Sequence, residues 1–356
     1  MNHMSIGIDF ADLGIEAEFA PDEETPVEEP KGRNLIAGSV LAKTLFSVWD
    51  GVPVTVVDSP PGAGKTTLVT KVVAYLKERS DLKVVIASPT KRGAYDLSQR
   101  IAAELGLDVH DNPQVALVVG KMKPPAGASK GGVEDAGRNV PVVRTVASCR
   151  ISPPECDIMI IDEAYQVTFN DAAAAADGAS QVLMVGDPGQ IGPVVTADVT
   201  AFRGRDTAPH MRAPEVFSRL EGAVVHSLES SFRVGARTVE AIAPLYDFPF
   251  VSSRPERFLM GADGARMDEI VSLEVPVSTS FDALDTLVRV ASCAAGMVGV
   301  ELVEVAEDGS EMRRKLVPAD VAVVVAHNAQ SSGIGAILSA MKIEGIMVGT
   351  ADKMQG

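Results

Sequence analysis

The chain has no long hydrophobic run, and this absence is the first guide to its class. A membrane-spanning helix needs about 20 consecutive apolar residues, and no run approaches that length. The N-terminus also lacks the basic and then apolar pattern of a secretory signal. We therefore expect a soluble, cytoplasmic protein with no membrane partner. Hydrophobic residues still make up 46% of the 356 residues, which suffices for the cores of about two domains.

Cysteine is also scarce, with only Cys149, Cys156 and Cys293 in the whole chain. No two of them have the two-residue spacing that is typical of a zinc site, and no histidine cluster accompanies them. We therefore expect no zinc site and interpret the three as buried, reduced thiols.

Basic residues are missing from the first 30 positions, which hold nine acidic residues and no Lys or Arg. We interpret residues 1–33 as a disordered acidic tail, with an acidic docking segment as the alternative. Removing these nine charges from the net charge of −16 leaves −7 for the rest of the chain. Because that remainder can still carry a local basic strip, the net charge does not exclude a nucleic-acid partner.

Short apolar runs rich in β-branched residues recur from about Asn34 onward. Such runs suit strands buried on both faces of a parallel sheet. Two intervening segments, Lys65–Arg79 and Arg92–Leu105, have helical spacing, and the alternation predicts an α/β fold. The expected strands are Val54–Val57, Val84–Ala87, Ile158–Ile161, Val182–Val185, Val321–Val325 and Ile346–Val348.

We predict two α/β units, at residues 34–222 and 223–356, that meet near Gly222. The segment Lys121–Asn139 is rich in glycine, proline and charge, which predicts a surface loop. A second irregular zone, about Ser252–Leu316, is expected between two strand-rich blocks.

A phosphate-binding loop is predicted at Ser59–Thr67, where the chain reads SPPGAGKTT between the strand Val54–Val57 and a helix. The strict pattern begins with glycine, and here the small Ser59 replaces it. Lys65 is expected at the β- and γ-phosphates of ATP, and the Thr66 hydroxyl on Mg²⁺. The residues expected to bind the nucleotide are Pro61, Gly62, Ala63, Gly64, Lys65, Thr66 and Thr67.

Asp162 and Glu163 follow the apolar run Ile158–Ile161 directly. The carboxyl ends of parallel strands are where ligands bind in open α/β sheets. After a P-loop we expect Asp162 to hold Mg²⁺ and Glu163 to polarise the water that attacks the γ-phosphate. In isolation, the pair would equally suit the start of a helix.

The run Val182–Val185 is followed by Gly-Asp-Pro-Gly-Gln at Gly186–Gln190. At this point the chain resembles the superfamily 1 helicases, whose third motif reads G-D-x-x-Q after a strand. The resemblance covers about Asn34–Gly356 and implies a P-loop NTPase with two RecA-like parallel-sheet units, the second incomplete. Five further segments are similar to other motifs of that family, in its order: Ser88–Lys91 to motif Ia, Thr145–Ser148 to a short strand motif, Asp162–Gln166 to the Asp-Glu box, Leu228–Arg233 to motif IV and Val348–Gly356 to the beginning of motif V.

The resemblance also implies roles for single residues. Gln190 would sense the γ-phosphate, and Arg233 would reach it from the second unit, where it stabilises developing charge. The alternative for Arg233 is a surface ion pair with Glu229 or Glu240. The catalytic set is thus Lys65, Asp162, Glu163, Gln190 and Arg233. The expected contacts to a sugar–phosphate backbone are Pro89, Thr90, Lys91, Thr145 and Ser148, with turn and cap chemistry as the alternative for these residues.

Two features depart from the family pattern. The segment Arg33–Gly51 contains no glutamine, the residue that reads the adenine edge in many relatives. The sequence also ends at Gly356 inside motif V, so motif VI and its second arginine have no counterpart. We therefore expect a truncated sequence or a partner chain that completes the second unit.

Together these features predict an ATP-dependent helicase or translocase that uses Mg²⁺ and moves along single-stranded nucleic acid, DNA in preference to RNA. The variant of the Asp-Glu box favours the 5′→3′ class. A nucleotide-gated nucleic-acid-binding module with little or no turnover is the alternative. A P-loop kinase is a third hypothesis, in which Gly186–Gln190 and Arg233 have no evident place. The oligomeric state is not predicted.

Overall fold

The computed structural model describes residues 35–106, 115–118, 123–130, 140–274, 280–306 and 308–354. The predicted acidic tail, residues 1–33, lies outside the described residues, as do the last two residues of the motif V similarity.

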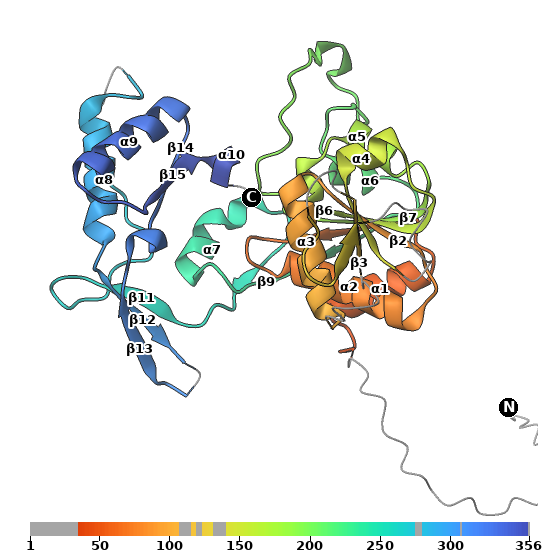
Figure 1. Ribbon diagram of the computed structural model, residues 1–356, viewed down its shortest axis with the longest axis horizontal. Helices are drawn as coiled ribbons and strands as arrows, with labels where there is room; N and C mark the ends of the chain where they lie inside the picture. The colour runs from red at the N-terminus through yellow and green to blue at the C-terminus, as the bar shows by residue number, and fades with distance from the viewer. Residues whose placement is uncertain are drawn as a thin grey trace, which may run out of the picture. The chain divides into compact units, whose positions relative to one another are not determined.

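An eight-stranded parallel sheet forms the first part of the fold, with the order β4-β3-β5-β2-β6-β7-β1-β8 (Figure 1). Most of its strands are short and apolar, as expected for a sheet covered on both faces. The strands are β1 (Val54–Asp58), β2 (Val84–Ser88), β3 (Val115–Val118), β4 (Ala128–Lys130), β5 (Val142–Thr145), β6 (Cys156–Asp162), β7 (Ala179–Gly186) and β8 (Val224–Ser227).

Helices cover both faces of this sheet (Figure 1). One face carries α1 (Val40–Trp49), α2 (Lys65–Arg79) and α3 (Lys91–Glu104), and the other carries α4 (Val146–Ile151), α5 (Phe169–Ala175) and α6 (Ala213–Phe217). Because successive strand residues point to opposite faces, Ile158 and Ile160 pack under the first set, and Met159 and Ile161 under the second.

The rest of the chain forms smaller elements. Strand β9 (Ser230–Ser231) pairs with β10 (Val251–Ser252), and α7 (Ala236–Ile242) lies between them in sequence. A three-stranded antiparallel sheet combines β11 (Arg257–Met260), β12 (Glu301–Val305) and β13 (Glu311–Lys315). The parallel pair β14 (Ala322–Val325) and β15 (Met347–Thr350) packs with α8 (Leu284–Met297) and α9 (Asn328–Ala340), and the helix α10 (Ala351–Met354) follows β15.

The predicted α/β fold class is confirmed: the first part is a parallel sheet between two layers of helices, and the second part holds a partial sheet. The six predicted strands and two predicted helices are all present within a few residues of their expected limits. The proposed division near Gly222 stays a prediction, but β8 lies beyond it and still pairs with β1.

Three expectations were wrong. The expected loop Lys121–Asn139 contains β4, which its glycine and proline content concealed and which pairs with β3. The zone Ser252–Leu316 is not irregular, because β11, β12, β13 and α8 lie within it. Cys149 and Cys156 are buried as expected, but Cys293 is exposed on α8.

No helix in the described part of the chain combines the length and the apolar character that crossing a membrane requires.

Candidate nucleotide-binding site

The predicted P-loop joins β1 to α2. Gly62 and Gly64 have positive φ angles of 74° and 88°, the left-handed region in which a side chain would be strained. Within the described chain no side chain caps the N-terminus of α2, so its first N–H groups remain available to an anion. A Cβ on Gly62 would lie 2.2 Å from the Cβ of Arg233, so glycine is also required by close packing. The loop therefore has the backbone geometry of a phosphate cradle.

Lys65, the first residue of α2, points toward the ends of the two neighbouring strands. Its Nζ lies 3.9 Å from Glu163 Oε1, after β6, and 3.8 Å from Asp187 Oδ2, after β7. All three side chains are mostly buried, which strengthens their electrostatic interactions relative to an exposed pair. The two carboxylates therefore hold the lysine at the loop. The oxygens of a bound phosphate could take their place as partners of the Lys65 ammonium group.

Asp162 ends β6 as a buried carboxylate. Burial and the neighbouring Glu163 raise the pKa of Asp162 to about 7. Its Oδ1 has no hydrogen-bond partner among the described residues, although buried polar atoms normally have one. Asp162 and Thr66 line the same cavity of about 530 Å³. A buried carboxylate oxygen without a protein partner, in a cavity that a threonine also lines, fits the oxygen ligands that Mg²⁺ prefers.

Glu163 has a φ of 51°, an uncommon conformation for a residue with a side chain and one of the strained geometries that cluster at functional sites. Burial raises the pKa of its carboxyl group. Gln166 Nε2 donates to Glu163 Oε2 at 3.5 Å and to Gln190 Oε1 at 3.2 Å. The Asp-Glu box and the third motif are thus linked by the amide of Gln166, to which we had assigned no role.

Asp187 is a second residue that the sequence interpretation missed, although it lies inside the quoted third motif. Its side chain is fully buried, and its Oδ1 accepts hydrogen bonds from Gly189 N at 3.0 Å and from the Tyr246 hydroxyl at 2.9 Å. A Cβ on Gly189 would lie 2.5 Å from the Tyr246 oxygen, so glycine permits this approach. Tyr246 follows α7 and lies in no motif, so no sequence signal pointed to it.

The segment that carries Arg233 is tied to the P-loop. The Ser231 hydroxyl donates to Pro61 O at 2.6 Å, and Phe232 N donates to Gly62 O at 3.0 Å. Arg233 lines the P-loop cavity of about 450 Å³ together with Lys65, Glu163 and Gln190. The alternative partner Glu240 instead pairs with Arg237.

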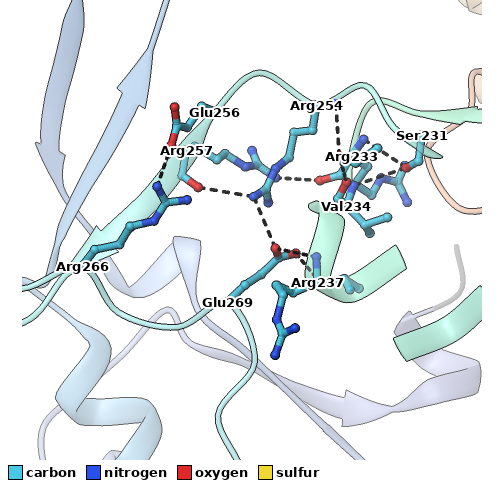
Figure 2. A network of polar contacts seen from close by, with 11 residues as sticks. Ser231, Arg233, Val234, Arg237, Arg254, Glu256, Arg257, Arg266 and Glu269 are labelled. Carbon is cyan, nitrogen blue, oxygen red and sulfur yellow. Dashed lines mark hydrogen bonds and ion pairs between the residues drawn. The ribbon is translucent and has the colours of Figure 1, made fainter. Parts of the chain in front are cut away.

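Two further arginines, Arg100 from α3 and Arg257 from β11, line the same cavity. Arg257 Nη2 also donates to the main-chain oxygen of Arg233 at 3.0 Å (Figure 2). Neither arginine lies in a recognised motif, and only the tertiary structure brings them to the loop.

The predicted nucleic-acid contacts separate into two groups. Pro89 and Thr90 line the 530 Å³ cavity, and Lys91, Thr145 and Ser148 do not. Thr90 Oγ1 accepts from Gly93 N at 3.0 Å and caps α3, while Thr145 Oγ1 accepts from Ser148 N at 3.2 Å and caps α4. Both threonines therefore perform the cap chemistry considered as the alternative, and Thr145–Ser148 is a strand end followed by a helix rather than a short strand.

Residues 47–217 match the family model described as an AAA domain. This segment contains the sheet strands β1–β7, the P-loop, Asp162, Glu163 and Gln190. The match covers just under half of the chain, and within it the segments that resemble superfamily 1 helicase motifs lie in their expected order.

Solved helicase structures are also similar to the chain. The PRRSV helicase is 15% identical over 87% of this chain and 55% of its own, with a TM-score of 0.37. The Arterivirus nonstructural protein 10 helicase, solved in complex with DNA, is 21% identical over 61% and 46%, with a TM-score of 0.40. Unliganded Pif1 from Bacteroides sp. is 19% identical over 59% and 45%, with a TM-score of 0.35. No curated protein matched. The chain spans about half the length of these helicases.

Proposed function

We propose that the chain binds ATP with Mg²⁺ and couples its hydrolysis to movement along single-stranded nucleic acid, as a helicase or translocase. The observation that carries the proposal is the convergence on one cavity of the P-loop, Glu163, Gln190 and Arg233. A phosphate-binding loop alone would support any P-loop enzyme. The glutamine after β7 and the arginine from beyond β8 support the helicase class in particular.

In this proposal the backbone N–H groups of Gly62–Thr67 and the Lys65 ammonium bind the β- and γ-phosphates. Thr66 and Asp162 would hold Mg²⁺, which when bound neutralises phosphate charge. Glu163 orients a water molecule and accepts its proton, and Arg233 stabilises the negative charge that develops on the γ-phosphate. The raised pKa of Glu163 suits a group that must accept a proton near neutral pH.

Coupling to a strand would run through Gln166 and Gln190. Gln190 lines both the P-loop cavity and the neighbouring 530 Å³ cavity that Pro89 and Thr90 border. A change in the contacts of Gln190 on loss of the γ-phosphate can therefore alter both cavities. We expect DNA in preference to RNA and 5′→3′ movement, as the Asp-Glu box variant favours.

ATP hydrolysis measured with and without single-stranded DNA or RNA tests the proposal. We expect a strand to stimulate turnover, and chelation of Mg²⁺ by EDTA to abolish it. Glu163→Gln should retain nucleotide binding and lower turnover by about 10²–10⁴-fold, the usual contribution of a general base. Turnover that no strand changes would contradict the helicase function. Strand binding that responds to nucleotide without any turnover would instead support the nucleotide-gated binding module.

A further inference from the structure

A second basic cavity lies beside the nucleotide site, between α7 and the strands β11 and β12. It has a volume of about 430 Å³, and four arginines line it: Arg237, Arg254, Arg257 and Arg266. Figure 2 shows these side chains together with Glu256 and Glu269. We call this cavity the arginine pocket. Its charge is notable because the chain as a whole carries −16.

The lining of the arginine pocket holds more guanidinium groups than carboxylates, while Glu240 and Glu256, outside the lining, pair with Arg237 and Arg266. Only two carboxylates, Asp268 and Glu269, line it against four guanidinium groups. Glu269 is fully engaged: its Oε2 accepts from Arg237 N at 3.3 Å, its Oε1 accepts from the Thr238 hydroxyl, and Arg254 Nη2 lies 4.0 Å away. The carboxylates of the lining therefore do not engage all four arginines, and Arg237 and Arg266 pair with carboxylates outside it.

Two of the arginines can exchange their present partners at low cost. Arg237 pairs with Glu240 and Arg266 with Glu256, and all four side chains are more than half exposed. Exposed ion pairs contribute only about 0–1 kcal/mol, so a better anion can replace them. Arg254 is different, because its side chain is only 16% exposed and it donates to Arg257 O at 3.3 Å. Burial and the nearby Arg257 lower the pKa of Arg254, which an anion in the pocket would counteract.

The lining of the pocket also indicates the class of anion. Arginine binds phosphate oxygens in a planar, two-pronged geometry. The aromatic ring of Phe258 and three aliphatic side chains complete the wall, and Arg266 lies 4.4 Å from the centre of that ring. Guanidinium groups combined with an aromatic face are typical of sites for single-stranded nucleic acid, where phosphates and unstacked bases are bound together.

We propose that the arginine pocket binds the phosphodiester backbone of a single nucleic-acid strand. This inference rests on the proposed function and adds a binding site to it, apart from the segments that resemble helicase motifs. Arg257 lines both this pocket and the P-loop cavity, and it donates to the main-chain oxygen of Arg233. A strand in the pocket therefore contacts the residue that positions Arg233 beside the nucleotide.

The test is the binding of a fluorescent oligothymidylate to the full chain, measured by anisotropy across a salt series. Arg237→Gln/Arg266→Gln removes the two exposed guanidinium groups and leaves Arg257 in place. We expect this double variant to bind about 10-fold more weakly at low salt. Its slope of log affinity against log salt should fall by roughly 1.4, since each strand phosphate contact contributes about 0.7.

The matched control is Arg313→Gln/Arg314→Gln. These arginines lie on β13 of the same antiparallel sheet, are about half exposed, and pair with Glu301, Glu311 and Asp320 outside the pocket. The control makes the same change in net charge and should keep the wild-type slope. If the pocket double variant unfolds, Arg237→Gln alone is measured, and its slope should fall by about 0.7.

Several outcomes would overturn the inference. Equal losses in the two double variants would indicate a general charge effect. Calorimetry could show that inorganic pyrophosphate binds the wild type but not the pocket variant while both bind the strand equally. The pocket would then be a site for a free phosphate anion. If the pocket variant binds the strand with wild-type affinity and its hydrolysis is still stimulated by the strand, the pocket is not a strand-binding site. The proposed function would then stand without it. A wild type that binds nucleotide but no strand would refute both.

Discussion

The two parts of the chain contribute to the nucleotide site in different ways. In residues 35–227, two large apolar clusters pack on either face of an eight-stranded sheet. Beyond residue 228, the described part has one cluster of six buried residues, from α8, α9 and β14. The first part can thus hold charged groups in a buried arrangement, because its extensive packing compensates for their desolvation.

The same contrast applies to the polar residues of the site. Lys65, Asp162 and Asp187 are nearly or fully buried and lie at the ends of strands or the start of a helix. Arg233 and Arg257, from the second part, are exposed and come from short strands and their connections. The phosphate-binding residues of the first part are therefore held in place by packing. The arginines of the second part reach the site through long side chains whose charged ends lie in solvent.

The largest effect should come from the core that supports the cradle. Leu183→Ala on β7 removes a fully buried side chain from the larger cluster, and we expect the free energy of unfolding to fall by about 4 kcal/mol. Leu338→Ala on α9, in the smaller cluster, should cost about 2 kcal/mol because a thinner core can relax around the cavity. Urea denaturation of both variants measures the difference. Equal costs would show that the second part packs as tightly as the first.

Lys65→Ala should remove the main cation of the cradle. We expect nucleotide affinity to fall about 100-fold, since hydrogen bonds to charged groups contribute roughly 1.5–3 kcal/mol. The loss should be similar for ATP and ADP if the lysine lies at the β-phosphate as well as the γ-phosphate. Titration of a fluorescent nucleotide provides the measurement. Lys71→Ala, on the same helix but absent from the cavity lining, is the control and should bind as the wild type does.

Arg257→Ala tests whether the second part acts on the terminal phosphate. We expect a loss of about 10-fold in affinity for a non-hydrolysable ATP analogue and little change for ADP. The reason is that Arg257 lines the cavity and positions Arg233 through its main-chain oxygen. Calorimetry with both nucleotides measures the split. An equal loss for both would place Arg257 away from the γ-phosphate.

Thr145→Ala should have the smallest effect, a loss of about 1 kcal/mol in unfolding free energy, because Thr145 caps α4. Thr145→Ser keeps the cap oxygen and should restore stability. Strand affinity should not change in either variant if the hydroxyl serves only as a cap. Weaker strand binding by Thr145→Ala that Thr145→Ser restores would support the predicted backbone contact.

The sequence predicted the placement of residues correctly where a motif coincides with local backbone structure. A P-loop needs a strand, two glycines and a helix start within one short segment, so Ser59–Thr67 could be recognised without the fold. Asp162 and Glu163 were found for the same reason, at the end of an apolar strand. Gln166, Asp187 and Tyr246 were missed, because their importance lies in hydrogen bonds between segments up to 59 residues apart.

The strands likewise divide into those that the sequence predicted and those that it did not. Runs of β-branched residues predicted the central strands, since burial on both faces leaves a continuous apolar signal. Strand β4 and the antiparallel strands β11–β13 gave no such signal. The strand β13 is exposed at every residue and consists of charged residues apart from Met312, so its pairing with β12 rather than its composition makes it a strand.

By itself, the sequence determined a phosphate-binding loop, a neighbouring carboxylate pair and an α/β fold. Each of these depends on local backbone conformation or on burial, and short stretches of sequence specify both. Beyond Arg233, which the motif resemblance had already named, only the tertiary structure decided which distant arginines complete the site. Arg100, Arg233 and Arg257 reach one cavity from three separate elements, and charge acts through space rather than along the chain. The arginine pocket follows from the same fact, since its four guanidinium groups are brought together by packing alone.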